Sequence, residues 1–496
     1  MIDQLISELV AYGLENGLID DADKVYVTNG LLELFQRQDY QEPEKLGKPR
    51  KLQLILDDLL EFALSQGILE DDTVTMRGLL DTKIMGILTP APSVVRKIFE
   101  EKYQVSPKAA TEFYYHFSQA TNYIRTDRII KDEKWETDTE FGKMDITINL
   151  SKPEKDPRDI AKDGTAKKSG YPACLLCREN EGYAGHLSHP ARQNHRIIPI
   201  TLCGEQYYLQ YSPYVYYNEH CIIFNKNHIP MVINEITFNK LLDFVKQFPH
   251  YMAGSNADLP IVGGSILSHD HFQGGSYVFA MAKAPYEQEF DLERYPDIHA
   301  GIVKWPMSVI RLQGRAMDSI VAAANHILTK WRGYSDPEVN IFSDTDGIPH
   351  NTITPIARMR GDLYELDLVL RNNITTIDCP LGLFHPHTEY HHIKKENIGL
   401  IEVMGLAVLP ARLKKEMAEL EQAILNHEDL RQNETVAAHA EWAEGWIPKY
   451  KIADSNIHSI IQKEIGIVFA KVLEDAGVYK RTDEGKAAFK RFIESL

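Results

Sequence analysis

The sequence is poor in cysteine, and its basic residues are too few to balance the acidic ones. Five cysteines in 496 residues do not make a disulfide framework and fit a reducing compartment better. The 54 lysines and arginines face 71 aspartates and glutamates, so the net charge is 54 − 71 = −17. This charge argues against general binding of nucleic acid or membranes. It leaves room for a local basic pocket that takes a phosphorylated substrate.

We also expect no signal peptide and no transmembrane helix. The N-terminus begins Met1-Ile2-Asp3-Gln4 and lacks the basic and apolar regions of a signal peptide. No apolar run approaches the roughly 20 residues that a transmembrane helix needs. We therefore expect a cytoplasmic protein.

The chain is too long for one hydrophobic core, and its 44% hydrophobic content is typical of packed globular proteins. Helical spacing of apolar residues predicts a helical N-terminal domain over 1–140, read as an accessory or dimerisation domain without chemistry. A strand-rich catalytic core is expected over 141–415, and a helical region over 416–496. Helices within the core are predicted at Asn234–Phe248 and Ala316–Trp331. Strands are predicted at Met144–Leu150, Tyr207–Tyr211, Cys221–Phe224, Tyr277–Ala280 and Leu363–Leu370.

Two imidazoles and one carboxamide recur at every second residue within Gly264–Gly275. On an extended strand His269, His271 and Gln273 would share one side, while Asp270 and Phe272 would point to the other. Such a surface suits metal binding, or attack on a phosphoryl group with a donor beside it. The flanking glycines allow a bulky ligand to approach the backbone. A strand with two incidental histidines is the alternative.

Cys174 and Cys177 form a C-x-x-C pair, which indicates either half of a zinc site or a redox pair. The redox interpretation requires a thioredoxin-like βαβ context, which the flanking sequence lacks. Two further zinc ligands would then come from elsewhere, and His228 and His269 are candidates. Two free thiols packed in a core remain the alternative.

The cysteine pair, then a lone histidine after an apolar strand, then His-x-His-x-Gln, resembles the galactose-1-phosphate uridylyltransferases of the histidine-triad superfamily. The resemblance is closest to their second bacterial class, which has a long helical N-terminal extension. It covers residues 145 to 415 by motif and the whole chain by length and layout. It implies an α+β protein with a mainly antiparallel histidine-triad-type sheet as its core.

The resemblance also implies a reaction: UDP-glucose and galactose-1-phosphate exchange a uridylyl group by double displacement. His271 would be the nucleophile through Nε2, with its Nδ1 proton accepted by the backbone carbonyl of His269. Gln273 would donate its amide hydrogens to the phosphoryl oxygens. The implied ligands of a structural zinc are Cys174, Cys177, His228 and His269.

Gln273 stands where the hydrolase branch of the superfamily has a third histidine. Glutamine binds charge but neither gives nor takes a proton. This suits a transferase, because a sugar phosphate has its second pKa near 6 and needs no base to attack. A nucleotidyl hydrolase or phosphorylase, or a non-catalytic zinc-stabilised binding module, are the alternatives.

Further residues are weaker candidates. Asn256 and Ser265 precede the motif and are predicted to bind ribose or phosphate. His220 is interpreted as a satisfied core histidine rather than a site residue. His385 and His387 are candidates for a second metal, which would also need a carboxylate from Glu287 or Glu289.

The family's phosphate-binding arginines have no clear counterpart in the sequence. Basic residues near the expected place, each better explained as a solvated charge, are Arg125, Arg128, Lys152, Lys155 and Arg158. The partners expected are the two small-molecule substrates and a second copy of the chain in a homodimer.

Overall fold

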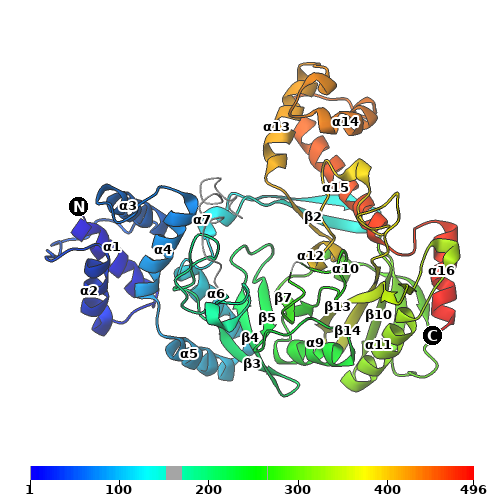
Figure 1. The fold of residues 1–496 in the computed structure, drawn as a ribbon, viewed down its shortest axis with the longest axis horizontal. Coiled ribbons are helices and arrows are strands. Elements are labelled where there is room, and N and C mark those ends of the chain that lie inside the picture. The colour runs from blue at the N-terminus through cyan, green and yellow to red at the C-terminus, as the bar shows by residue number, and fades with distance from the viewer. Residues whose placement is uncertain (1, 152–169, 265) are drawn as a thin grey trace. The chain divides into compact units, whose positions relative to one another are not determined.

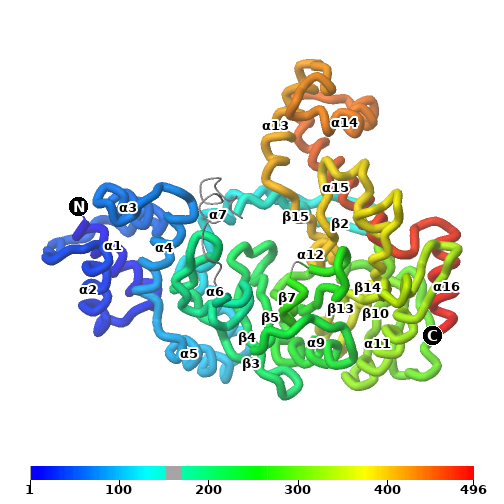
Figure 2. The backbone as a smooth tube through the Cα atoms, in the orientation of Figure 1, coloured from blue at the N-terminus to red at the C-terminus, as the bar shows by residue number. Residues whose placement is uncertain are grey.

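The computed structural model describes residues 2–151, 170–264 and 266–496 (Figures 1 and 2). Its internal contacts divide the chain into two compact units. The first unit comprises residues 1–131, 151–215 and 221–228, and the second comprises 132–150, 216–220 and 229–496. The predicted three-part division of the chain is a different partition, and it stays a prediction.

Helices build the N-terminal part of the first unit, and capping residues set where they start. Thr73 accepts a hydrogen bond from the backbone N–H of Met76 at the start of α4, and Ser106 accepts one from Ala109 at the start of α6. The helices are α1 (Ile2–Glu15), α2 (Lys24–Leu34), α3 (Leu52–Ser65), α4 (Val74–Leu88), α5 (Pro92–Val105), α6 (Pro107–Ala120) and α7 (Thr126–Ile129).

Three strands complete the first unit. They are β3 (Ile198–Leu202), β4 (Glu205–Tyr211) and β5 (Cys221–Asn225), and they pair antiparallel in this order. Helix α6 packs against these strands. The hydroxyl of buried Tyr211 on β4 donates to the backbone oxygen of Thr111 on α6 at 2.9 Å. The strands predicted at 207–211 and 221–224 are confirmed.

The second unit contains a larger antiparallel run of strands. Its order is β7-β6-β13-β14-β10-β9-β8. Helices α9 and α11 pack on one face of this run, as Figure 1 shows. The bounds are β6 (Met252–Gly254), β7 (His271–Gly275), β8 (Tyr286–Phe290), β9 (His299–Val303), β10 (Val309–Gly314), β13 (Asn351–Arg360), β14 (Leu363–Asn372), α9 (Glu235–Gln247) and α11 (Met317–Arg332).

The rest of the second unit is a small sheet and a group of C-terminal helices, which Figure 2 shows in orange and red. Strand β2 pairs antiparallel with β1 and parallel with β15. Trp135 of β1 donates its indole N–H to the backbone of Gln462 on α15. The bounds are β1 (Glu133–Thr139), β2 (Gly142–Ile148), α10 (Ala280–Lys283), β11 (Asp344–Thr345), β12 (Ile348–Pro349), α12 (Leu400–Val403), β15 (Leu406–Leu409), α13 (Arg412–Leu425), α14 (Ala440–Trp446), α15 (Ile457–Ala476) and α16 (Asp483–Glu494).

These elements confirm the α+β class and the mainly antiparallel sheet. The predicted helices correspond to α9, which Asn234 caps, and to α11. One predicted strand is wrong: residues 277–279 are not extended in a sheet, and Ala280 begins α10. The aromatic side chains there pack onto Tyr217 in the core, so tertiary packing overrides strand propensity. Over the described ranges, every helix is too short or too polar to cross a bilayer.

Candidate active site

The loop that carries the two cysteines is held by an asparagine and a histidine. The Sγ atoms of Cys174 and Cys177 lie 3.5 Å apart. The buried amide of Asn180 donates to the backbone oxygens of Cys174 at 2.9 Å and Cys177 at 2.7 Å. Since this uses both amide hydrogens, its Oδ1 accepts the Nε2–H of His189 at 2.6 Å. Sequence reasoning missed Asn180 and His189, because only the folded loop reveals what they hold.

The four predicted metal ligands come together. Cys177 Sγ lies 3.2 Å from His228 Nδ1, and the ligand atoms of Cys174, Cys177, His228 and His269 all lie within 4.8 Å of one another. Ligands around a tetrahedral zinc are separated by about 3.3–3.8 Å. Two thiols and two imidazoles at this spacing fit a metal ion. Among the residues that the structure describes, this is the only such group.

The strand that carries His271 is shorter than the motif suggested. Strand β7 begins at His271, so His271 and Gln273 share a face, but His269 lies in a bend before the strand. Two backbone hydrogen bonds hold the bend, from Met231 N–H to Leu267 O and from Asp270 N–H to Ile229 O. The expectation that all three side chains alternate along one strand is therefore corrected. The bend lets the backbone of His269 turn toward the ring of His271.

His271 is buried, and one of its ring nitrogens has a fixed partner. Its Nδ1 lies 2.8 Å from the backbone oxygen of His269, which can only accept, so Nδ1 carries the proton. Burial lowers the pKa of His271, although this hydrogen bond opposes the shift. The neutral ring then presents an unprotonated Nε2, which is the state a nucleophile requires.

Gln273 contacts His220, which the sequence analysis had interpreted as a core histidine outside the site. Its Oε1 lies 3.1 Å from Nε2 of His220, a buried histidine whose ring contacts those of Tyr216 and Tyr217. The interpretation of His220 as a core histidine is therefore incomplete, since its one polar contact is a residue of the motif. Burial lowers the pKa of His220 to about 4, which keeps the ring neutral.

Asn256 has a structural contact. Its Oδ1 accepts the backbone N–H of Leu400 at 3.0 Å, and a Cβ at Gly264 would lie 2.5 Å from its Nδ2. Its predicted role in ribose or phosphate binding stays a prediction. Ser265 lies outside the described residues.

The basic candidates divide into two groups. Arg125 is tied to Asp81 by an ion pair. Burial lowers the pKa of Arg128, and the nearby positive charge of Arg125 lowers it further. The remaining three lie outside the described residues: Lys152, Lys155 and Arg158.

The second histidine cluster does not gather ligands. His385 Nε2 lies 3.0 Å from Asn397 Oδ1, and His387 Nδ1 lies 3.3 Å from Asp475. Glu287, a suggested carboxylate, is held by Arg481 at 2.6 and 2.7 Å. Glu289, the other suggested carboxylate, lies 3.2 Å from His299. Within the described part of the chain, these residues form no group of three ligating side chains, so the structure adds no support to a second metal.

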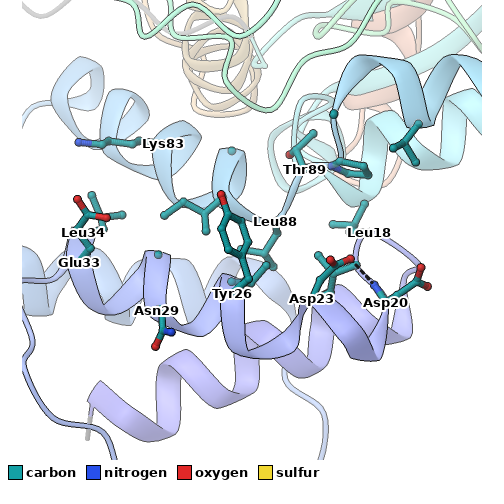
Figure 3. Close-up of a pocket in the computed structure, with 18 of the residues that line it drawn as sticks. Leu18, Asp20, Asp23, Tyr26, Asn29, Glu33, Leu34, Lys83, Leu88 and Thr89 are labelled. Atoms are coloured by element: carbon teal, nitrogen blue, oxygen red, sulfur yellow. Dashed lines mark hydrogen bonds between the residues drawn. The ribbon is translucent and has the colours of Figure 1, made fainter.

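A hollow in the N-terminal helices of the first unit is a separate feature (Figure 3). Its lining includes Leu18 from the turn after α1, Tyr26 from α2 and Leu88 from α4. Beside them the backbone N–H of Asp20 donates to Asp23 at 3.2 Å. The described residues that line the hollow include no histidine or cysteine. It therefore offers none of the groups on which the predicted chemistry depends.

Comparison with known proteins covers most of the chain. The family model for the N-terminal domain of galactose-1-phosphate uridyl transferase matches residues 17–230, and the model for the C-terminal domain matches residues 243–444. A galactose-1-phosphate uridylyltransferase of Clostridium acetobutylicum is 54% identical over 100% of both chains. One of Bacillus subtilis is 52% identical, covering 99% of this chain and 97% of the relative.

A solved structure of a yeast Ap4A phosphorylase matches with a TM-score of 0.33 and 12% identity, covering 67% of this chain and 92% of that one, which is too weak to support a conclusion. The two family models together cover most of the chain, and the identities to the relatives extend over its full length. The chain belongs to the galactose-1-phosphate uridyl transferase family.

Proposed function

We propose that this protein converts UDP-glucose and galactose-1-phosphate to UDP-galactose and glucose-1-phosphate through a uridylyl group carried on His271. The observation that carries the proposal is the hydrogen bond from His271 Nδ1–H to the backbone oxygen of His269 at 2.8 Å. It leaves the Nε2 lone pair available for attack on phosphorus. Full-length relatives with the corresponding name support the substrates.

The two half-reactions are balanced without a general base. Nε2 of His271 attacks the α-phosphorus of UDP-glucose, a P–N bond forms, and the bridging P–O bond breaks as glucose-1-phosphate leaves. A phosphate oxygen of galactose-1-phosphate then attacks the same phosphorus, and the P–N bond breaks. The acceptor is a dianion near neutral pH, because its second pKa is about 6. The chain therefore needs mainly to position the groups and stabilise charge.

Gln273 is proposed to donate its amide hydrogens to the nonbridging phosphoryl oxygens. It lies two residues after His271 on the same face of β7. Its amide does not titrate, so it stabilises negative charge without competing for the proton on His271. Asn256 and Ser265 are proposed as substrate contacts on the family resemblance alone.

A structural zinc is proposed at Cys174, Cys177, His228 and His269. When bound, zinc with four protein ligands supplies no open position and acts by fixing structure. The consequence for the reaction comes through His269, whose backbone oxygen orients His271. A protein without its metal would thus lose the geometry of the nucleophile.

The assembly and location are proposals as well. The family resemblance supports a homodimer in the cytoplasm, and the absence of disulfides among the described cysteines fits a reducing compartment. Light scattering after size exclusion tests the dimer, and a monomeric, fully active protein would refute it. The 1–140, 141–415 and 416–496 division is likewise proposed.

The testing experiment is intact-protein mass spectrometry after incubation with UDP-glucose alone. We expect a gain of one uridylyl group, discharged when galactose-1-phosphate is added, and no gain in His271→Ala. Turnover of His271→Ala should be abolished. An adduct that persists in His271→Ala would reject His271 as the nucleophile. A protein that forms no adduct and instead releases uridylate to water or orthophosphate would be a hydrolase or phosphorylase.

A further inference from the structure

A short segment of the second unit, residues 216–220, is docked on the strand that carries His271 and Gln273. The hydroxyl of Tyr217 donates to the backbone oxygen of Gly274 at 2.9 Å, and the side-chain amide of Asn218 donates to Ser276 O at 3.2 Å. Tyr251 donates its hydroxyl to the carboxylate of Glu219. These bonds fix the segment along β7.

Gly275 is what allows the approach to be so close. It adopts φ +150°, and a Cβ there would lie 2.7 Å from the backbone oxygen of Glu219 and 2.8 Å from the Tyr217 ring. Any larger residue would push the segment away from the strand. The close contact between the segment and β7 therefore requires glycine at position 275, the last residue of the motif.

The docked segment places His220 with one fixed hydrogen-bond partner. Its Nε2 lies 3.1 Å from Gln273 Oε1, while its Nδ1 is buried without a partner. A buried donor without a partner is rarer in proteins than an unsatisfied acceptor, so the proton belongs on Nε2. Nε2–H then donates to Gln273 Oε1, so the amide oxygen of Gln273 faces His220 and its nitrogen points away from that ring.

We propose that His220 is a positioning residue that fixes the orientation of the Gln273 amide, so that its two N–H groups, and not its oxygen, face the phosphoryl group. This rests on the proposed function, because it assigns an orientation to the phosphoryl donor of that site. An unrestrained amide would also present its oxygen, which repels a phosphoryl oxygen.

The test is a double-mutant cycle with transfer rate and adduct formation as readouts. His220→Phe keeps a ring in contact with Tyr216 and Tyr217 and removes the donor, whereas His220→Gln keeps an N–H near the place of Nε2. We expect His220→Phe to lower kcat about 10- to 100-fold, less than the roughly 100- to 1,000-fold loss when such a donor is removed altogether, with KM changed less than about twofold. His220→Gln should recover most of the rate.

Repeating the His220→Phe substitution in the Gln273→Ala variant separates a positioning role of His220 from a structural one. In Gln273→Ala, adding His220→Phe should lower kcat by less than about twofold, because the residue that His220 holds is gone. Equal loss in both backgrounds would overturn the inference. So would failure of His220→Gln to restore more activity than His220→Phe. His220→Leu replaces His220→Phe in the cycle if the latter does not yield folded protein.

Failure of the proposed function would look different. In that case the protein with its natural sequence would form no adduct from UDP-glucose, or Gln273→Ala alone would leave kcat unchanged. If the adduct forms and Gln273→Ala slows transfer, while His220→Phe has no effect on kcat, only the role of His220 is refuted.

Discussion

At the scale of single residues, burial decides what the histidines can do. His271 donates through Nδ1 to a backbone oxygen, and His189 and His220 donate through Nε2 to side-chain amides. Desolvation lowers the pKa of all three, so each ring stays neutral and has one N–H to give. A neutral imidazole with a fixed tautomer is a directed donor or nucleophile rather than a diffuse positive charge.

Asn180 gives a prediction at this scale. Asn180→Asp keeps the size of the side chain but removes both donors to the backbone of the cysteine loop. Lost support of metal ligands typically lowers metal affinity about 10- to 100-fold. We expect a loss of this size for zinc, measured by competition with a chromogenic chelator. Ser188→Ala, in the same loop but exposed, is the control, and equal affinity in both variants would contradict the prediction.

At the scale of elements, buried charge joins the central strands of the second unit. Arg311 on β10 holds Asp367 on β14 at 2.6 and 3.0 Å, and Arg358 on β13 bonds the same carboxylate. Glu365, also buried, forms an ion pair with Arg358, whose Nε lies 2.9 Å from Glu365 Oε1. Burial alone would raise the pKa of Asp367, but the two guanidinium groups hold it below its usual value. These pairs tie three neighbouring strands together on one face.

Removal of one charge from this network should be costly. Asp367→Asn leaves guanidinium groups buried with less compensation, and we expect the free energy of unfolding to fall by about 3–5 kcal/mol. Since the folded pKa of Asp367 is depressed, its contribution is present above the unfolded pKa of about 3.9 and is lost as pH falls through the folded value. Urea unfolding at pH 7 and pH 3 measures both effects. This account would be contradicted if the free energies of unfolding of the natural protein and Asp367→Asn differed more at pH 3 than at pH 7.

Two helical glycines make a matched pair of predictions. Gly466 on α15 faces β1, and a Cβ there would lie 2.3 Å from Thr137, whereas a Cβ at Gly78 on α4 would meet nothing within 4 Å. Gly466→Ala should lower the free energy of unfolding by about 1–3 kcal/mol through overpacking. Gly78→Ala should raise the free energy of unfolding by about 0.4–1 kcal/mol, because alanine lowers the conformational entropy of the unfolded chain. Thermal unfolding measures both, and a stabilising Gly466→Ala would refute the contact of α15 with β1.

At the scale of the whole molecule, the chain does not divide into consecutive blocks. Residues 132–150 and 216–220 belong to the second unit, although the chain on both sides of 216–220 belongs to the first. The proposed metal ligands are spread along the sequence from Cys174 to His269. Metal binding is therefore expected to affect the folding of more than one segment of the chain.

Metal removal tests this expectation. Treatment with a strong chelator should lower Tm and transfer activity together, and zinc should restore both. Cys174→Ser should lower Tm and zinc content in the same way while leaving His271 itself unaltered. Metal analysis and differential scanning calorimetry provide the measurement. Well-folded protein that contains no zinc and keeps its Tm after chelation would refute a structural metal.

The sequence alone determined the family and the α+β class, because Cys-x-x-C, His228 and His-x-His-x-Gln are local patterns that resemble those of the family. The roles of these residues stay predictions. Only the tertiary structure decided that His269 lies in a bend, that Asn180 holds the cysteine loop and that His220 meets Gln273, 53 residues away. Those contacts depend on which segments pack together, and packing between distant segments leaves no periodic trace in a single sequence.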